Sequence, residues 1–223
     1  DPEPTQRPAR SLKGAKAGRL VRTLVDFTPP LGTREIARIA EIDPGYVSRL
    51  LALLERDDLI GREPRGPVTR IEWPNLLRAW TKDYSLDSSN LTTSYLQPRG
   101  LPALLDALRG QEGEEALTYA ISGSLAAARR SPIAPARLGV VYVKRLDEAA
   151  QMLGLLPTET GANVLLVEPF DGVVFERTVL DDGLRYAAPS QAAADLLTSS
   201  GRGPEEAEAL IEWMLANEEE WRA

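Results

Sequence analysis

The sequence contains neither cysteine nor histidine among its 223 residues. The absence of cysteine excludes disulfides, thiolate zinc sites and cysteine nucleophiles. The absence of histidine removes the commonest general base near neutral pH and the commonest imidazole metal ligand. Serine hydrolases of the triad type, zinc hydrolases and most transition-metal enzymes are therefore disfavoured, and carboxylates that hold Mg²⁺ are the one enzymatic route left.

Long apolar runs are also missing. No stretch approaches the roughly 18 apolar residues of a membrane-spanning helix, and the first segment, DPEPTQRPARSLKGAKAG, lacks the apolar centre of a secretory signal. We therefore expect a cytoplasmic protein without a membrane partner. The first residue is Asp1 rather than Met, so a longer natural N-terminus stays an open alternative.

Charge is distributed unevenly along the chain, whose net charge is -7. Residues 1–82 hold 15 Lys and Arg against 11 Asp and Glu, a net charge of +4, whereas the remainder holds 11 against 22, a net charge of -11. Such asymmetry indicates a basic module for nucleic acid joined to an acidic domain that meets other partners.

The chain begins with a predicted tail and a predicted helix. Residues 1–11 are polar and rich in proline, so we expect a flexible tail. In residues 12–27 the apolar side chains recur with the 3.6-residue spacing of an amphipathic helix, which Pro29 and Pro30 end. The opposite, polar face of this helix carries Lys13, Lys16, Arg19 and Arg22.

Two shorter helices are predicted next. Thr33 is a suitable N-cap for the first, and Asp43 can cap the second, with Pro44 at the first helical position. One side of the second helix is an apolar stripe of Val47, Leu50, Leu51 and Leu54. The other side, near its N-terminus, presents Gly45, Tyr46, Ser48 and Arg49.

A hairpin is predicted after these helices, from the segments LIGR and VTRIEW at residues 59–62 and 68–73. Three helices and a hairpin are typical of a winged helix-turn-helix, whose third helix enters the DNA major groove by its N-terminal turns. We therefore expect double-stranded DNA to be bound by Gly45, Tyr46, Ser48, Arg49, Arg62, Arg65, Arg70, Lys13 and Lys16.

Different members of this set have different expected contacts. Arg49 can read guanine with two hydrogen bonds, whereas the arginines of the hairpin can meet phosphate or the minor groove. Lys13 and Lys16 can add contacts to the phosphate backbone that are independent of sequence and sensitive to salt. The alternative is a winged helix that binds protein, with basic residues that only solvate its surface.

Composition also predicts a domain boundary. Residues 74–84 can form a short helix or linker, and residues 87–90 then turn to Asp, Ser and Asn. We therefore place a DNA-binding domain at residues 12–84 and an acidic α/β domain at residues 85–223. In this second domain the pattern predicts helices and strands in mixed order, which indicates an α+β fold overall.

The expected elements of the second domain follow from periodicity and turn residues. Helices are predicted at residues 100–109, 124–129, 147–153, 190–198 and 204–218. Strands are predicted at residues 140–143 and 163–167, and a hairpin is predicted from a turn at 169–172 into a strand at 173–177.

The segment YAISGSLAAARRSPIAPARLGVVYV, residues 119–143, has an apolar strand that ends at Ser122, Gly123 and Ser124. Nucleotidyltransferase-like domains begin in this way, and active members present two carboxylates on the following strand to bind Mg²⁺. Here that strand is GVVYV and has no acidic residue. The nearest acidic residues are Asp147, Glu148, Glu168 and Asp171. They are more easily explained as residues at helix starts or in turns, so we expect no metal and no cofactor.

The C-terminal segment APSQAAADLLTSSGRGPEEAEALIEW, residues 188–213, is interpreted as two helices around a glycine-containing break. Arg202 lies between two glycines, where it can bind a ligand or cap backbone carbonyls. On physical grounds alone this motif leaves both roles open.

These segments together resemble the AbiEi family of antitoxins and related regulators from type IV toxin-antitoxin, or abortive infection, systems. The resemblance rests on the winged helix, YAISGSLAA, GVVYV, GANVLLVEPFDGVVFE and SQAAADLLTSSGRGPEEAE. It implies an N-terminal domain that binds promoter DNA and represses its own operon. It also implies a C-terminal domain, similar to a nucleotidyltransferase without its active site, that counteracts a nucleotidyltransferase toxin.

The sequence therefore predicts a DNA-binding transcriptional regulator without enzymatic activity. Its expected partners are promoter DNA, a nucleotidyltransferase toxin and a second copy of the chain on DNA. Two alternatives stay open: a Mg²⁺-dependent nucleotidyltransferase, and a winged-helix adaptor that binds only protein.

Overall fold

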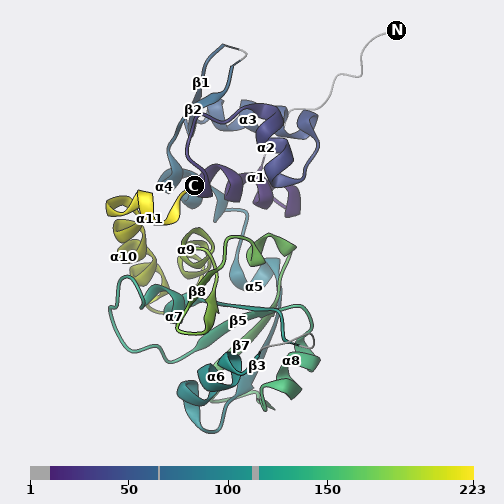
Figure 1. Ribbon diagram of the computed structural model, residues 1–223, viewed down its shortest axis with the longest axis vertical. Coiled ribbons are helices and arrows are strands. Elements are labelled where there is room, and N and C mark those ends of the chain that lie inside the picture. Colours follow the sequence, from purple (N-terminus) through teal and green to yellow (C-terminus); the bar gives the residue numbers. More distant parts are fainter. Residues whose placement is uncertain (1–10, 65, 112–115) are drawn as a thin grey trace. The chain divides into compact units, whose positions relative to one another are not determined.

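The computed structural model describes residues 11–64, 66–111 and 116–223 (Figure 1). They form an α+β fold with a mixed sheet, as the sequence predicts. The chain divides into two compact units: the first ends at Tyr84 and includes Arg222 and Ala223, and the second is Ser85–Trp221. Apart from Ser11, the predicted tail lies outside the described residues, and so does Arg65.

Helices dominate the first unit, and its described helices are α1 (Ala15–Asp26), α2 (Thr33–Ala40), α3 (Pro44–Arg56) and α4 (Trp73–Trp80). Helix α2 packs against α1 and α3, and α4 packs against α1. The predicted apolar stripe of α3 is confirmed as core, because Leu50 and Leu54 are only 1% exposed and Leu51 is fully buried. The spacing of apolar residues therefore fixes which side of α3 is buried.

The two predicted N-caps have different outcomes. Asp43 caps α3, since its Oδ1 accepts a hydrogen bond from the Tyr46 N–H at 3.0 Å. Thr33 was predicted to cap α2 but is its first helical residue, and Gly32 is the N-cap. The prediction was wrong because the Glu35 carboxylate accepts from the Gly32 N–H at 3.3 Å and stabilises the helix start from inside the first turn.

The predicted hairpin is confirmed as strands β1 (Ile60–Arg62) and β2 (Val68–Ile71), which pair antiparallel. An isolated bridge also pairs Leu31 with Val68, so the segment between α1 and α2 joins the hairpin.

Arg22 does not lie on a polar face of α1, as predicted, but is only 2% exposed. Its guanidinium donates from Nη2 to Oδ2 of Asp26 at 2.9 Å, one helical turn away, so the two buried charges compensate each other. The prediction was wrong because both α2 and α4 pack against α1, which widens its buried surface beyond one apolar stripe.

The last two residues complete the first unit by satisfying backbone groups at the end of α1. The Ala223 N–H donates to the Asp26 carbonyl at 2.9 Å. The Arg222 guanidinium donates to the carbonyls of Val25 and Phe27 at 3.0 and 2.9 Å. Carbonyls that a helix end leaves without intrahelical partners are thus paired by residues almost 200 positions away in the sequence.

A mixed sheet forms the centre of the second unit, in the strand order β6-β3-β7-β5-β4-β9-β8. Strands β5 and β7 are parallel, as are β4 and β9, and the other neighbours are antiparallel. The strands are β3 (Leu91–Leu96), β4 (Tyr119–Ser122), β5 (Gly139–Val143), β6 (Leu156–Pro157), β7 (Val164–Glu168), β8 (Val179–Asp181) and β9 (Leu184–Tyr186).

Helices cover both faces of this sheet, with α6 and α8 on the opposite side of the strands from α9 and α10 (Figure 1). The described helices of the unit are α5 (Leu86–Ser89), α6 (Gly100–Arg109), α7 (Gly123–Ala127), α8 (Leu146–Met152), the 3₁₀ helix η1 (Gly172–Phe175), α9 (Pro189–Leu197), α10 (Gly203–Ala216) and α11 (Glu218–Trp221).

Strand β5 shows how the sequence builds two cores. Its side chains alternate, so Val141 and Val143 join a cluster with α6 and α8, whereas Val140 and Tyr142 join a cluster on the other face. Because both faces are covered, the strand is apolar throughout, which is typical of an internal strand. This alternation also determines that Tyr142 faces α9.

The predicted strand at residues 173–177 is wrong, since η1 occupies most of it. Asp171 caps this turn, with its Oδ1 accepting from the Val173 N–H at 2.8 Å. Val173 and Val174 are both buried, so their apolar side chains serve a packed turn rather than a strand. In the part of the chain that the structure describes, no helix has both the length and the apolar character needed to cross a membrane.

Candidate functional site

The N-terminal turns of α3 form the surface that the sequence predicts for DNA contact. Ser48 is exposed, and Gly45, Tyr46 and Arg49 are partly exposed. A Cβ at Gly45 would lie 3.0 Å from Oδ1 of Asp43, so the residue after Pro44 is kept small by the capping carboxylate. The Asp43 cap therefore goes together with a small, polar surface at the start of α3.

The Tyr46 ring lies near two cations from different helices. The Arg49 guanidinium carbon is 5.7 Å from the centre of the Tyr46 ring, and Nζ of Lys16 from α1 is 5.8 Å from it. Both distances are within the range of cation–π contacts. Burial raises the pKa of the Tyr46 hydroxyl above its ordinary value, and the Arg49 charge offsets part of this rise. The hydroxyl therefore stays protonated at neutral pH and can donate a hydrogen bond.

The structure thus brings Lys16, Tyr46 and Arg49 together, and we call these three residues the α1–α3 cluster. Lys13 is exposed two residues before the start of α1. Lys13 therefore lies near the same end of α1 as Lys16.

The two described arginines of the hairpin differ in their partners. Arg70 donates to Glu72 at 2.7 Å and to Asp58 at 2.6 Å, and these hydrogen bonds raise the pKa of its guanidinium. Arg62 has no ion pair with any described residue, and its Nε is buried without a hydrogen-bond partner. The Arg62 charge is therefore not paired by a described residue, whereas the Arg70 charge is compensated by Asp58 and Glu72. Arg65 lies outside the described residues.

Three motifs of the second unit that lie far apart in the sequence meet in a fully buried network around the Asp195 carboxylate. Ser122 Oγ donates to Oδ2 of Asp195 at 2.5 Å, and Tyr142 Oη lies 2.9 Å from both carboxylate oxygens. Gln191 Nε2, one turn earlier on α9, donates to Oδ1 at 2.9 Å. This network joins the end of β4, the middle of β5 and α9.

A second contact joins the Gly-Ser segment to α10. Ser124 Oγ donates to Oε2 of Glu206 at 2.5 Å. Gly123 has a φ of 61°, which favours glycine, and a Cβ there would meet the Val140 side chain at 3.1 Å. The sharp turn from β4 into α7 therefore depends on Gly123.

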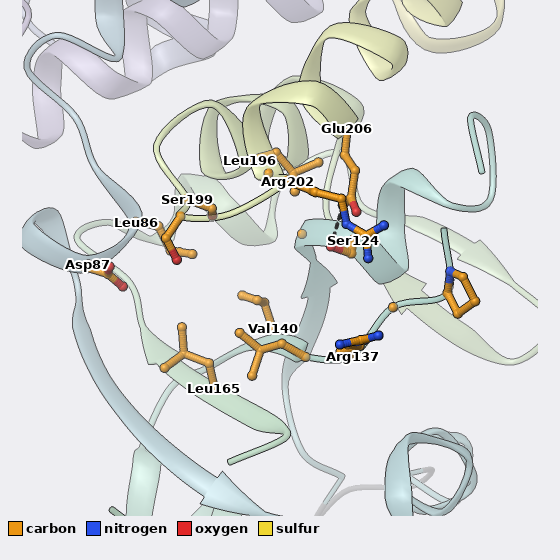
Figure 2. A pocket seen from close by; sticks show the side chains of 16 residues that line it. Leu86, Asp87, Ser124, Arg137, Val140, Leu165, Leu196, Ser199, Arg202 and Glu206 are labelled. Carbon is orange, nitrogen blue, oxygen red and sulfur yellow. Dashed lines mark hydrogen bonds between the residues drawn. The ribbon is translucent and has the colours of Figure 1, made fainter. Parts of the chain in front are cut away.

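These contacts border a pocket of about 340 Å³, shown in Figure 2. One part of it is lined by Arg202, the N-cap residue of α10, together with Glu206 of α10, Ser124 of α7 and Arg137. Leu86 and Asp87 of α5 line another part. In Figure 2 the guanidinium groups of Arg137 and Arg202 lie on the same side of the pocket, with Ser124 and Glu206 beside Arg202.

The acids weighed as metal ligands do not meet. Asp147 and Glu148 occupy the first turn of α8, Asp171 caps η1, and Glu168 ends β7. No group of three or more potential ligands among the described residues is arranged to hold a metal ion.

The roles of Tyr142, Gln191 and Asp195 were not predicted from the sequence. The sequence does indicate that Gln191 and Asp195 can interact, since they are four residues apart and so lie on the same face of a helix. Tyr142 could have been placed with them only by knowing which face of β5 meets α9. Comparisons of the chain with protein-family models, curated proteins and solved structures found no match.

Proposed function

We propose that the chain is a non-enzymatic, DNA-binding transcriptional regulator and that its N-terminal unit is a winged helix-turn-helix. The observation that carries the proposal is the α1–α3 cluster, in which Lys16 and Arg49 both lie within 6 Å of the Tyr46 ring centre at the start of α3. The order of three helices followed by an antiparallel hairpin supports it.

In this proposal the N-terminal turns of α3 enter the major groove. Arg49 donates two hydrogen bonds to guanine, while Lys16 and the Tyr46 hydroxyl contact phosphate. Ser48 is exposed on the same turns and adds a donor or acceptor toward a base edge. Arg62 supplies a phosphate contact from the hairpin, and Lys13 supplies one near the start of α1.

Fluorescence anisotropy with the full chain tests this function. The labelled probe is duplex DNA from upstream of the protein's own gene, and the control is a shuffled duplex of the same length and composition. We expect the upstream duplex to bind about 10³-fold more tightly or better, with both affinities falling as KCl is raised. Equal affinity for the two duplexes would overturn specific regulation, and absence of binding to both would favour the protein-binding adaptor.

The second unit is proposed to be a partner-binding domain, similar to a nucleotidyltransferase without its active site. Strand β5 supports this, because the position where active members present two carboxylates is occupied by buried apolar residues and a tyrosine. The acidic composition of this part of the chain suits a partner with a basic surface.

The partner proposed here is a nucleotidyltransferase toxin, and the chain is then an antitoxin that represses its own operon. Co-expression with the product of an adjacent nucleotidyltransferase gene should restore growth that the toxin alone arrests. Growth arrest that is unchanged by co-expression would remove the antitoxin role and leave the regulator. Incubation of the chain with labelled nucleoside triphosphates and Mg²⁺ should give no nucleotide transfer; transfer above the blank would overturn the non-enzymatic assignment.

A further inference from the structure

The pocket of Figure 2 has the size of a small-molecule site. Its volume of about 340 Å³ lies within the roughly 300–1,000 Å³ that is usual for such sites. All of its lining residues belong to the second unit. A ligand bound there is therefore recognised by this unit alone, independently of the DNA-binding surface.

Arg137 and Arg202 give the pocket its recognition chemistry. Both are exposed, both line the pocket, and neither side chain forms an ion pair or hydrogen bond with any described residue. Unpaired arginines are unusual in a region that has twice as many acidic as basic residues. Most arginines of this unit that do not line the pocket form ion pairs or hydrogen bonds. Those with side-chain partners are Arg109, Arg129, Arg130, Arg145, Arg177 and Arg185.

Two guanidinium groups on one side of a pocket fit a group with several acceptor oxygens. Guanidinium binds carboxylate and phosphate oxygens through parallel hydrogen bonds, and phosphate can engage two arginines at once. The two arginines therefore give this side of the pocket a preference for an anionic group.

The rest of the pocket calls for more than a simple anion. Val140, Leu165 and Leu196 line it with aliphatic surface, and Leu86 adds to this from α5. Figure 2 shows Val140 and Leu165 close together, to the left of Arg137. An apolar part of a ligand would pack against this wall, in which Leu165 is partly exposed.

Glu206 adds a third requirement. Its Oε2 accepts from Ser124, while Oε1 has no partner among the described residues, and its carboxylate lines the pocket only 9% exposed. A carboxylate in this position selects a ligand that carries an N–H donor as well as an anionic group.

We propose that this pocket binds a purine mononucleotide, with its phosphate groups on Arg137 and Arg202, its ring against Val140 and Leu165, and an N–H group donating to Glu206. The walls are prepared for this ligand, because Gly123 and the Asp195 network hold the β4–α7 turn and α9 in place. The inference does not depend on the DNA-binding function, and the pocket needs no catalytic metal to hold the nucleotide.

Isothermal titration calorimetry on the full chain tests the proposal with ADP, ribose 5-phosphate and inorganic phosphate as probes. We expect ADP to bind at least about tenfold more tightly than ribose 5-phosphate and inorganic phosphate, since only ADP engages the ring surface and Glu206. Arg137→Ala and Arg202→Ala should each weaken ADP binding about tenfold or more. Arg99→Ala is the matched control, because Arg99 is exposed and its side chain also has no described partner; it should leave ADP affinity unchanged.

Glu206→Gln separates ring recognition from anion binding. It keeps an oxygen for Ser124 but removes the carboxylate charge, so ADP should lose affinity while ribose 5-phosphate does not. No heat with millimolar ADP, equal affinities for ADP and inorganic phosphate, or ADP binding that is unchanged in Arg137→Ala and Arg202→Ala would each overturn the proposal. Circular dichroism confirms that each variant is folded.

Discussion

The guanidinium of Arg49 lies one helical turn after Tyr46 and 5.7 Å from the centre of its ring. Nζ of Lys16 from α1 lies 5.8 Å from the same ring centre, so one aromatic ring contacts cations from two helices. The ring holds both cations near the exposed start of α3, and the order of helices and the Asp43 cap decide its position. The predictions on DNA binding start from this arrangement.

Arg49→Ala should weaken binding to the upstream duplex by about 10- to 100-fold, because a bidentate guanine contact is worth roughly 1–3 kcal/mol. The matched control is Arg56→Ala, at the other end of α3, where the arginine is exposed and paired with Asp57. Fluorescence anisotropy with upstream and shuffled duplexes measures both variants. An Arg49→Ala protein that keeps full preference for the upstream duplex would remove Arg49 from base recognition.

The hairpin arginines should differ in their contribution to DNA binding. Arg62→Ala should reduce the slope of log affinity against log salt by about one, because one phosphate contact is lost. Arg70→Ala should change this slope less, since the Arg70 charge is already paired with Asp58 and Glu72. Anisotropy titrations at several KCl concentrations provide the slopes. Equal losses from the two substitutions would show that the Arg70 ion pairs open on DNA.

DNA affinity should be constant between pH 6.5 and about pH 9. The chain has no histidine or cysteine, so no ordinary side-chain pKa lies in this interval. Tyr46 does not change this, because burial raises the pKa of its hydroxyl above its ordinary value of 10.0. Its proton is therefore lost only at higher pH than from a free tyrosine. Anisotropy at constant ionic strength measures the profile, and Tyr46→Phe should show the same flat profile at lower affinity.

Periodicity and caps predicted the helical parts of this fold well. The 3.6-residue pattern and the Asp43-Pro44 pair define α3, and the apolar run GVVYV defines β5, because burial on one face or on both leaves a direct pattern in the sequence. The α1–α3 cluster was predictable in its members but not in its contacts, since Lys16 and Tyr46 meet only through the packing of α1 with the other helices.

The strands that were not predicted from the sequence are β3, β6, β8 and β9. Strands β8 and β9 have three residues each, too few for an alternation pattern, and β8 is an exposed sheet edge. The run after Asp171 resembles a strand in composition, yet the Asp171 cap turns it into η1. The Asp195 network could not be predicted, because its members come from β4, β5 and α9, and only sheet order brings them together.

Asp195→Ala should destabilise the second unit by roughly 2–4 kcal/mol. The substitution removes the carboxylate that accepts from Ser122, Tyr142 and Gln191, and a buried donor that loses its acceptor costs about 1–3 kcal/mol. Asp195→Asn keeps one carbonyl oxygen and should cost less. Urea unfolding followed by circular dichroism measures the loss, with Glu212→Ala on the exposed surface of α10 as the control. Equal stability of the Asp195→Ala and Glu212→Ala proteins would contradict the buried network.

Gly203→Ala should disturb the start of α10. An added Cβ would lie 2.7 Å from Cβ of Ser199 and 2.8 Å from the carbonyl oxygen of Leu196, and backbone on that side cannot simply rotate away. The helix start must shift, at a cost of about 1–3 kcal/mol for overpacking. Because Arg202 and Glu206 flank this position, the shift should also weaken ADP binding in the calorimetric assay.

The matched control for this substitution is Gly110→Ala, in the same unit. Gly110 has a φ of -72°, and a Cβ there would meet its nearest atom at an ordinary 3.6 Å. Replacing a glycine whose backbone other residues can adopt usually stabilises a protein by about 0.4–1 kcal/mol, because the unfolded chain loses freedom. Urea unfolding should therefore move the two variants in opposite directions. If Gly203→Ala is as stable as Gly110→Ala, the close approach of α10 to Leu196 is not a constraint, and the glycine before Pro204 is not needed to form the pocket wall.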